Sequence, residues 1–293
     1  MAEIHPSAHR QRIDIVSIFP GFFDGFLSHG VVARAAARGL VELRVHDLRE
    51  FTHDAHRTVD DRPFGGGEGM VLKPEPLAEA LDSLGVLPAS QRDPQSRESV
   101  ILLAAQGERF TQTVARELAG LERIVLLCGR YEGIDDRIRQ LYCDRELSIG
   151  DYVLSGGELP AAVVADAVVR LIPGVLGNAA SAAYESFGLE DSTMDLLAEN
   201  DTEGGLHNPV QRSQVPRSQH GSGGLLDYPH FTRPAEFRGL HVPQALLSGD
   251  HQAIRRWRRE QQLATTLRNR PDLLEAATLS EEDRQTLVRL RQS

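Results

Sequence analysis

Short runs of consecutive apolar residues recur in the first half of the chain and predict buried strands. Residues 100–105 (VILLAA) and 124–128 (IVLLC) are continuous apolar runs, which is typical of parallel strands covered on both faces. Residues 12–19 and 40–45 predict two further strands, and residues 111–121 predict a helix that links two of the strands. This alternation of strands and helices indicates an α/β fold.

A strongly apolar helix is predicted at residues 158–172. Pro160 lies near its first turn, and Pro173-Gly174 end it. Residues 161–169 are apolar on nearly every face, so we expect this helix to be buried on all sides. A helix that needs cover all round often lies in a subunit interface.

The pattern changes at residue 187. Residues 187–224 are rich in polar and small residues and lack an apolar period, which predicts a flexible, largely disordered linker or insertion. Asp250 is expected to cap a helix that runs to about Arg270, and Ser280 to cap a last helix to about Arg291. The apolar stripe of the first of these helices is expected to consist of Ile254, Trp257, Ala264 and Leu267.

These elements divide the chain into three predicted parts. Residues 1–177 form an α/β domain, residues 178–224 an interdomain linker that contains the insertion, and residues 225–293 a small, all-helical domain. Hydrophobic residues make up 41% of the 293 residues, enough for a real core. No apolar run approaches the roughly 20 residues of a membrane helix, and the N-terminus lacks the apolar stretch of a secretory signal, so we expect a cytoplasmic protein without membrane contact.

Charge is distributed unevenly along the chain. The formal net charge of −10 argues weakly against a nucleic-acid partner, but local patches decide such contacts. Residues 251–270 hold six arginines and one acid, Glu260, whereas residues 190–203 are acidic. Arginine suits bidentate phosphate contacts. The predicted C-terminal helices therefore carry a candidate basic face.

Three glycine-containing loops each follow a predicted strand: residues 104–107 (AAQG), 129–133 (GRYEG) and 148–158 (SIGDYVLSGGE). Ligands of open α/β sheets bind where such loops converge, at the carboxyl ends of the strands. One such loop is more often a simple turn, but three together favour a ligand site. The chain lacks a phosphate-binding P-loop and a dinucleotide fingerprint, and His53 and His56 have no partners that would complete a zinc site.

Five segments resemble the bacterial tRNA (guanine-N1)-methyltransferase family. They are residues 60–70 (DDRPFGGGEGM), 129–135 (GRYEGID), 148–160 (SIGDYVLSGGELP), 172–177 (IPGVLG) and 225–234 (LLDYPHFTRP). The resemblance covers almost the whole chain except the N-terminal dozen residues and the 187–224 insertion. It implies a SPOUT-type, trefoil-knotted parallel-sheet domain, a homodimer with active sites at its interface, and methylation of N1 of the guanosine just 3′ of the anticodon of tRNA.

The resemblance also implies S-adenosylmethionine as the methyl donor. The residues that match the family's cofactor contacts are Gln106, Gly107, Gly129, Tyr131, Glu132, Gly133, Ser148, Ile149, Gly150, Tyr152, Val153, Leu154, Gly156, Gly157 and Pro160. The segment before Gln106 departs from the family's commoner proline-containing form. The family's reaction is assisted by Mg²⁺, although no carboxylate cluster in this sequence marks a dedicated metal site.

The chemistry of the implied reaction requires a base and a cation. N1 of guanine carries a proton at neutral pH, which a general base must remove, and negative charge then develops on O6. Arg170 matches the family's catalytic arginine, although it also suits the last turn of a helix as a structural charge. The family's catalytic aspartate falls on Glu185, which is one methylene longer, and Asp191 is the rival candidate. Both carboxylates could also be solvated linker residues.

The remaining candidate residues concern RNA. Asp61 and Arg62 are expected to shape the guanine site or the dimer contact, and the residues expected to contact tRNA are Asp227, His230, Arg233, Arg255, Arg256, Arg258 and Arg259. Two other interpretations stay open: a related enzyme that modifies another RNA base, and a non-catalytic RNA-binding protein derived from the enzyme. The three intact glycine loops argue against the second.

Overall fold

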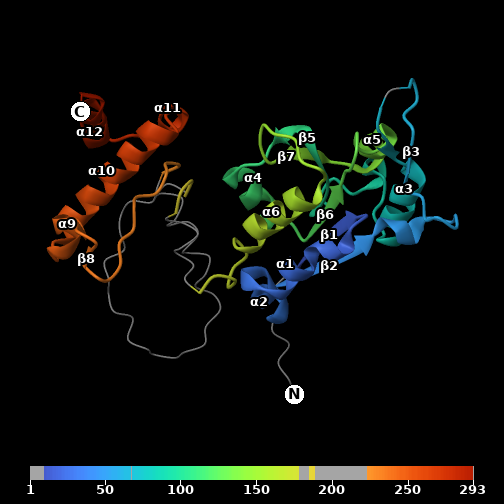
Figure 1. Cartoon of the computed structure of the whole chain (residues 1–293), viewed down its shortest axis with the longest axis horizontal. Coiled ribbons are helices and arrows are strands. Elements are labelled where there is room, and N and C mark those ends of the chain that lie inside the picture. Colours follow the sequence, from blue (N-terminus) through green and yellow to red (C-terminus); the bar gives the residue numbers. More distant parts are fainter. Residues whose placement is uncertain (1–9, 67, 178–184, 189–222, 293) are drawn as a thin grey trace, which may run out of the picture. The chain divides into compact units, whose positions relative to one another are not determined.

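The computed structural model describes residues 10–66, 68–177, 185–188 and 223–292. The chain divides into two compact units, Met1–Gly177 and Asn178–Ser293, and each is described by itself (Figure 1). Most of the predicted linker, with Asp191, lies outside the described residues. At the described ends of this stretch, the Phe187 N–H donates to the Leu225 carbonyl and the Gly224 N–H donates to the Gly188 carbonyl, both at 2.9 Å.

The first unit is built on a five-stranded parallel sheet in the order β2-β1-β6-β5-β7. The predicted α/β architecture with a parallel sheet is therefore confirmed. The strands are β1 (Gln11–Ser17), β2 (Val41–Asp47), β5 (Glu98–Arg109), β6 (Arg123–Cys128) and β7 (Arg145–Ser148). A separate antiparallel pair joins β3 (Asp60–Asp61) to β4 (Val71–Leu72).

Helices cover both faces of this sheet (Figure 1). The helices of this unit are α1 (Asp24–Ser28), α2 (Gly30–Ala37), α3 (Pro74–Ser83), α4 (Gln112–Ala119), α5 (Asp136–Tyr142) and α6 (Glu158–Val169). Side chains alternate between the faces, so Ile13 and Ile15 pack with α2, α4 and α6, whereas Val125 and Leu127 pack with α3 and α5. Both faces are covered, which explains why the central strands read as continuous apolar runs.

Helix α6 differs from its prediction in two respects. It ends at Val169 instead of residue 172, because the chain turns there through hydrogen bonds from the Leu171 and Ile172 N–H groups. The expectation that α6 is buried on all sides is wrong within this chain, since Leu159 and Val163 are 49% and 45% exposed. Its opposite face packs on the sheet, so an apolar side remains outward.

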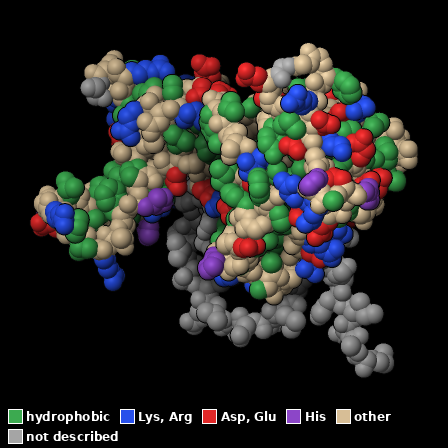
Figure 2. Space-filling model, turned by 45° about the vertical axis from the view of Figure 1, so that its right-hand side comes forward, with side chains coloured by type: hydrophobic (Ala, Val, Ile, Leu, Met, Phe, Trp, Pro, Cys, Tyr) green, Lys and Arg blue, Asp and Glu red, His purple; other side chains and the backbone are tan. Residues whose placement is uncertain are grey.

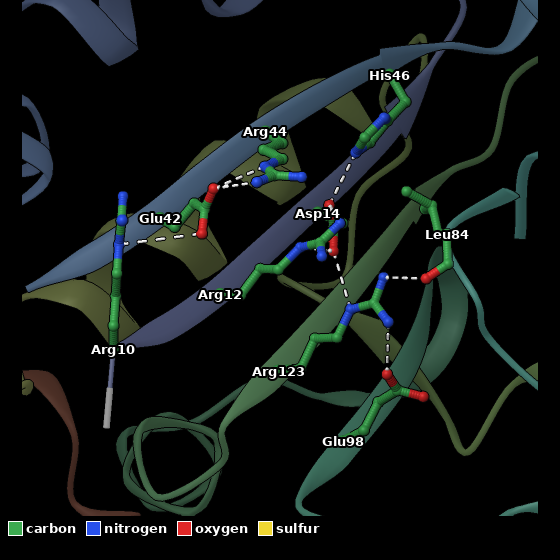
Figure 3. A network of polar contacts seen from close by, with 9 residues as sticks. All are labelled: Arg10, Arg12, Asp14, Glu42, Arg44, His46, Leu84, Glu98 and Arg123. Carbon is green, nitrogen blue, oxygen red and sulfur yellow. Dashed lines mark hydrogen bonds and ion pairs between the residues drawn. The ribbon is translucent and has the colours of Figure 1, made fainter. Parts of the chain in front are cut away.

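A buried carboxylate ties four neighbouring strands together (Figure 3). Asp14 on β1 is fully buried and binds Nε2 of His46 on β2 at 2.8 Å, Nη2 of Arg12 at 2.9 Å and Nε of Arg123 on β6 at 3.0 Å. Arg123 in turn donates to Glu98 on β5 at 2.9 Å. A charge that is taken out of water must be paired in this way.

The second unit is mostly helical. It contains α9 (Gln244–Leu247), α10 (His251–Asn269), α11 (Asp272–Ala276) and α12 (Glu281–Gln292), with β8 (Glu236–Phe237) and β9 (Leu240–His241). The expectation of an all-helical domain is wrong, because β8 and β9 form an antiparallel pair. Arg238 and Gly239 join them with φ of 52° and 80°, and two positive φ values are what a tight two-residue hairpin requires.

The predicted helix caps of this unit are confirmed. Asp250 accepts hydrogen bonds from the N–H groups of Gln252 and Ala253, and Ser280 accepts one from the N–H of Asp283. The predicted apolar stripe of α10 is only partly right. Its buried positions are Gln262, Leu263 and Thr266, with Leu267 packed beside them. The Thr266 hydroxyl accepts from the Leu226 N–H at 3.0 Å. An inward-facing threonine is invisible to a pattern based on hydrophobicity alone.

None of the helices in the described part of the chain combines the length and the apolar composition of a membrane span.

Candidate active site

A cavity of about 290 Å³ lies at the carboxyl ends of β6 and β7, beside the irregular middle part of β5. This volume is near the lower end of the roughly 300–1,000 Å³ of small-molecule sites. The cavity is lined by Leu102, Leu103, Ala104, Ala105, Gln106, Gly129, Arg130, Tyr131, Glu132, Gly133, Ile134, Asp136, Arg139, Leu147, Ser148, Ile149, Gly150, Tyr152, Val153, Leu154, Ser155, Gly156, Gly157 and Pro160. Parallel strands end at one edge of the sheet, so loops that are distant in sequence meet there.

The loop after β6 crosses very close to the loop that leads into α6. The Gly157 N–H donates to the Gly129 carbonyl at 2.9 Å, and Arg130 and Gly156 form an isolated antiparallel bridge. A Cβ on Gly157 would lie 2.6 Å from Cα of Cys128, which is too close for any side chain. Glycine is therefore required at this crossing.

The glycine-rich segment before β4 reaches the same site from another direction. The Glu132 N–H donates to the Met70 carbonyl and the Leu72 N–H to the Gly133 carbonyl, both at 3.0 Å. Tyr131, directly before these contacts, has φ of 57°, and the residue is 54% exposed beside the cavity. Burial and the Asp60 carboxylate raise the pKa of Tyr131 above its usual value.

The cavity brings together all the residues predicted to contact the cofactor except Gly107. Gly107 lies within β5, where the pairing with β7 shifts between Leu103 and Glu108. A Cβ at Gly107 would lie 2.5 Å from the carbonyl carbon of Glu146, so the glycine allows two backbones to approach. The predicted loop at 104–107 is therefore part of a longer, irregular strand.

Several residues that line the cavity were not predicted from the sequence. Arg130 stands inside the GRYEG motif, and Asp136 and Arg139 lie on α5, directly after it. They could have been found in the sequence from their position, because they are charged residues within or shortly after a glycine loop that follows a strand. Among the described residues, no group of three or more His, Cys, Asp and Glu side chains could hold a metal ion.

The two predicted catalytic residues do not line this cavity. Arg170 is the C-cap residue of α6, directly after Val169, and is half-buried. Glu185 is also half-buried, and its carbonyl accepts from the Gly188 N–H at 2.9 Å. The two residues belong to different compact units.

The residues predicted to contact RNA have different surroundings. Asp61 and Arg62 are exposed at the end of β3. In the second unit, His230 Nε2 lies 3.1 Å from Asp227 Oδ2, and Arg233 is exposed. Basic and acidic side chains are interspersed on the face shown in Figure 2.

The four arginines of α10 that were predicted to contact tRNA are not equivalent. Arg256 is exposed, and Arg255 Nε donates to the His251 carbonyl at 3.3 Å. The guanidinium carbon of Arg258 lies 5.0 Å from the Tyr228 ring centroid. Arg259 is held by Asp283, so its guanidinium serves an internal ion pair.

Known proteins resemble this chain over nearly its whole length. A relative from Koribacter versatilis (strain Ellin345) is 54% identical over 280 residues, which are 96% of this chain and 98% of the relative. One from Geobacter sulfurreducens (strain ATCC 51573 / DSM 12127 / PCA) is 46% identical over 279 residues, 95% of this chain and 97% of the relative. Both are named tRNA (guanine-N(1)-)-methyltransferase.

The family profile described as "tRNA (Guanine-1)-methyltransferase TrmD" matches residues 11–201 and 203–276. This match spans both compact units and every loop of the cavity. The chain therefore belongs to the TrmD family of tRNA (guanine-1)-methyltransferases.

Proposed function

We propose that this enzyme transfers a methyl group from S-adenosylmethionine to N1 of the guanosine just 3′ of the anticodon in tRNA. The observation that carries the proposal is one cavity lined by the glycine motifs at 129–133 and 148–157, where β6 and β7 end beside β5. The relatives that match 96% and 95% of the chain are named tRNA (guanine-N(1)-)-methyltransferase, which supports guanine N1 of tRNA as the acceptor.

The lining of the cavity suits S-adenosylmethionine. Backbone groups of the loops 129–133 and 148–157 can approach the edge of an adenine closely, and Ile149, Leu154 and Pro160 offer apolar surface to its ring. The negative carboxylates of Glu132 and Asp136 complement the positive charge of a sulfonium. When bound, this cosubstrate supplies an electrophilic methyl group, and the protein's task is to orient the acceptor.

Two side chains are assigned the chemical roles that methylation of N1 requires, removal of the N1 proton and stabilisation of the charge on O6. Glu185 removes the proton from N1 of guanine, and Arg170 stabilises the negative charge that develops on O6. Both side chains are half-buried, which strengthens charge interactions relative to bulk water. Asp191, the alternative base, lies outside the described residues. No step is assigned to Mg²⁺.

The proposal includes a trefoil knot and a homodimer. The close crossings at Gly157 and Gly107 are the contacts expected where a chain threads through its own loop. For the dimer, the outward apolar side chains of α6, Leu159 and Val163, are joined by Tyr152 and Val153, which are 54% and 87% exposed. Such surface is usually covered by a partner.

The second unit is proposed to hold the tRNA. Arg255, Arg256 and Arg258 on α10 are the phosphate contacts, with Asp227, His230 and Arg233 nearer the reacting base. Arg259 is not included among these phosphate contacts, because its guanidinium already binds the Asp283 carboxylate. Since tRNA is the substrate, the enzyme is assigned to the cytoplasm.

The test uses two tRNA transcripts that differ only at the nucleotide 3′ of the anticodon, guanosine in one and adenosine in the other. The full-length chain is incubated with methyl-labelled S-adenosylmethionine and each transcript. The proposal expects label only in the guanosine transcript. Equal labelling of both transcripts would move the reaction to another nucleotide, and no labelling would contradict the activity.

A further inference from the structure

Beneath the cavity lies a buried carboxylate that none of the functions above uses. The Glu158 side chain is 2% exposed and stands in the first turn of α6. Its Oε1 accepts from the Ser17 hydroxyl at 2.7 Å, and its Oε2 accepts from Nε of Arg130 at 3.0 Å. A second nitrogen of the same guanidinium, Nη2, lies 3.0 Å from Oε2. Glu158 thus joins the end of β1, the loop after β6 and the start of α6.

Arg130 connects this carboxylate to the cavity. Arg130 lines the cavity, and its guanidinium carbon lies 4.6 Å from the Phe19 ring centroid. Its backbone forms the bridge to Gly156, and a Cβ on Gly156 would lie 2.6 Å from Oε2 of Glu158. The ion pair therefore fills the space beside Gly156, at the point where the two cavity loops cross.

We propose that Glu158 is a positioning residue for the methyl donor, which acts through Arg130 to fix the loops 129–133 and 148–157 against each other. The Arg130 side chain is 21% exposed. A largely buried guanidinium without its carboxylate is unfavourable, so loss of Glu158 drives Arg130 toward water. Because Arg130 lines the cavity and bridges to Gly156, that movement changes the shape of the cavity. The identity of the ligand rests on the proposed function.

The variants Glu158→Gln and Arg130→Lys test this inference in the full-length chain. Glutamine keeps the size of the side chain without its charge, and lysine keeps a charge without the guanidinium fork. We expect the Kd for S-adenosylhomocysteine, measured by calorimetry without tRNA, to rise by about tenfold or more in each variant. The KM for S-adenosylmethionine should rise with it, while the KM for tRNA stays unchanged.

A matched control removes an exposed ion pair. Arg97 and Glu122 lie 3.2 Å apart with side chains 53% and 46% exposed, so Glu122→Gln should bind S-adenosylhomocysteine like the wild type. The double variant Arg130→Lys/Glu158→Gln supplies a second readout. If Glu158 acts through Arg130, the double variant should bind no more weakly than the weaker of the two single variants.

Hydrogen exchange in the ligand-free protein separates positioning from general destabilisation. The Gly157 amide, bonded to the Gly129 carbonyl, should exchange faster in both single variants, while amides of β1 and β6 stay protected. If Glu158→Gln does not fold, Arg130→Lys carries the test. Wild-type affinity in folded variants would overturn the inference, and failure of the wild type to bind S-adenosylhomocysteine would instead overturn the proposed function on which it rests.

Discussion

The Asp283 carboxylate binds the Arg259 guanidinium in a two-point ion pair, with Nε at 2.8 Å and Nη2 at 2.9 Å. The Arg259 side chain is 20% exposed and the Asp283 side chain 7%, so the pair is largely withdrawn from water. Asp283 also stands at the start of α12, where it accepts from the Ser280 N–H at 3.0 Å. An arginine that looks like an RNA contact in the sequence thus holds two helices of the C-terminal unit together.

Loss of this pair should destabilise the second unit. Arg259→Gln leaves Asp283 without its partner, and removal of one side of a buried pair costs about 3 kcal/mol. Urea unfolding followed by circular dichroism measures the change in the free energy of unfolding. Arg284→Gln is the matched control, since Arg284 and Glu281 are 65% and 74% exposed and such pairs contribute about 0.5 kcal/mol or less. Equal effects of the two variants would contradict the structural role of Arg259.

The exposed arginine of the same helix should behave differently. Arg256→Gln is expected to leave stability unchanged and to lower tRNA affinity, since Arg256 is exposed on α10. One lost phosphate contact reduces the slope of log K against log salt concentration by about one unit. Filter binding at several salt concentrations measures this slope. Arg256→Lys keeps the positive charge and should keep the wild-type slope. An unchanged slope in Arg256→Gln would show that Arg256 does not contact a phosphate.

Asp14 makes the first unit sensitive to acid. Burial alone would raise the pKa of Asp14, but hydrogen bonds from His46, Arg12 and Arg123 outweigh it and hold the pKa below the ordinary 3.8. The ionised carboxylate therefore contributes stability at pH values above its unfolded pKa, and this contribution is lost as the pH falls through the lower, folded pKa.

The corresponding variant is Asp14→Asn. It should lose about 3 kcal/mol of unfolding free energy at pH 6, and the gap to the wild type should narrow as the pH falls below 3.8. Urea unfolding between pH 6 and pH 3 measures both quantities. Asp151→Asn, at a side chain that is 85% exposed, should track the wild type throughout. If the difference in unfolding free energy between the wild type and Asp14→Asn stays constant with pH, the charge of Asp14 is not the source of its stabilising effect.

The general base is tested by two carboxylate variants. Glu185→Gln should lower kcat by at least about a hundredfold, since a positioned base contributes that much or more. Its affinity for S-adenosylhomocysteine should remain that of the wild type, because Glu185 does not line the cavity. Asp191→Asn should keep its activity. Full activity in Glu185→Gln together with loss in Asp191→Asn would assign the base to Asp191.

Much of the first unit could be predicted from the order of residues because both faces of its sheet are covered. Buried parallel strands such as β6 need apolar side chains at every position, and this leaves an unmistakable run at 124–128. The extension of β5 to Arg109 was not predicted, since the added residues Gln106–Arg109 are polar or glycine and lie beyond the covered core. The hairpin β8–β9 was missed because Arg238 carries no turn signal of its own.

The lining of the cavity was predicted from motifs, whereas the contacts beneath it were not. Glycines mark places where a backbone must approach another group, so the sequence pointed to Gly156 and Gly157 as part of the site. The partner of Arg130 could not be predicted in this way, because Glu158 lies 28 residues away and resembles an ordinary acidic residue in the first turn of a helix. The engagement of Arg259 by Asp283 was hidden for the same reason, since pairing depends on the packing of two helices.

The identity of the methylated nucleoside decides whether this enzyme methylates N1 of the guanosine 3′ of the anticodon. A tRNA transcript with guanosine 3′ of the anticodon is incubated with the wild-type enzyme and S-adenosylmethionine, digested to nucleosides and analysed by mass spectrometry. We expect one 1-methylguanosine per tRNA, located at that position by fragment mapping. A methyl group on another base, or on another atom of that guanine, would overturn the proposed function.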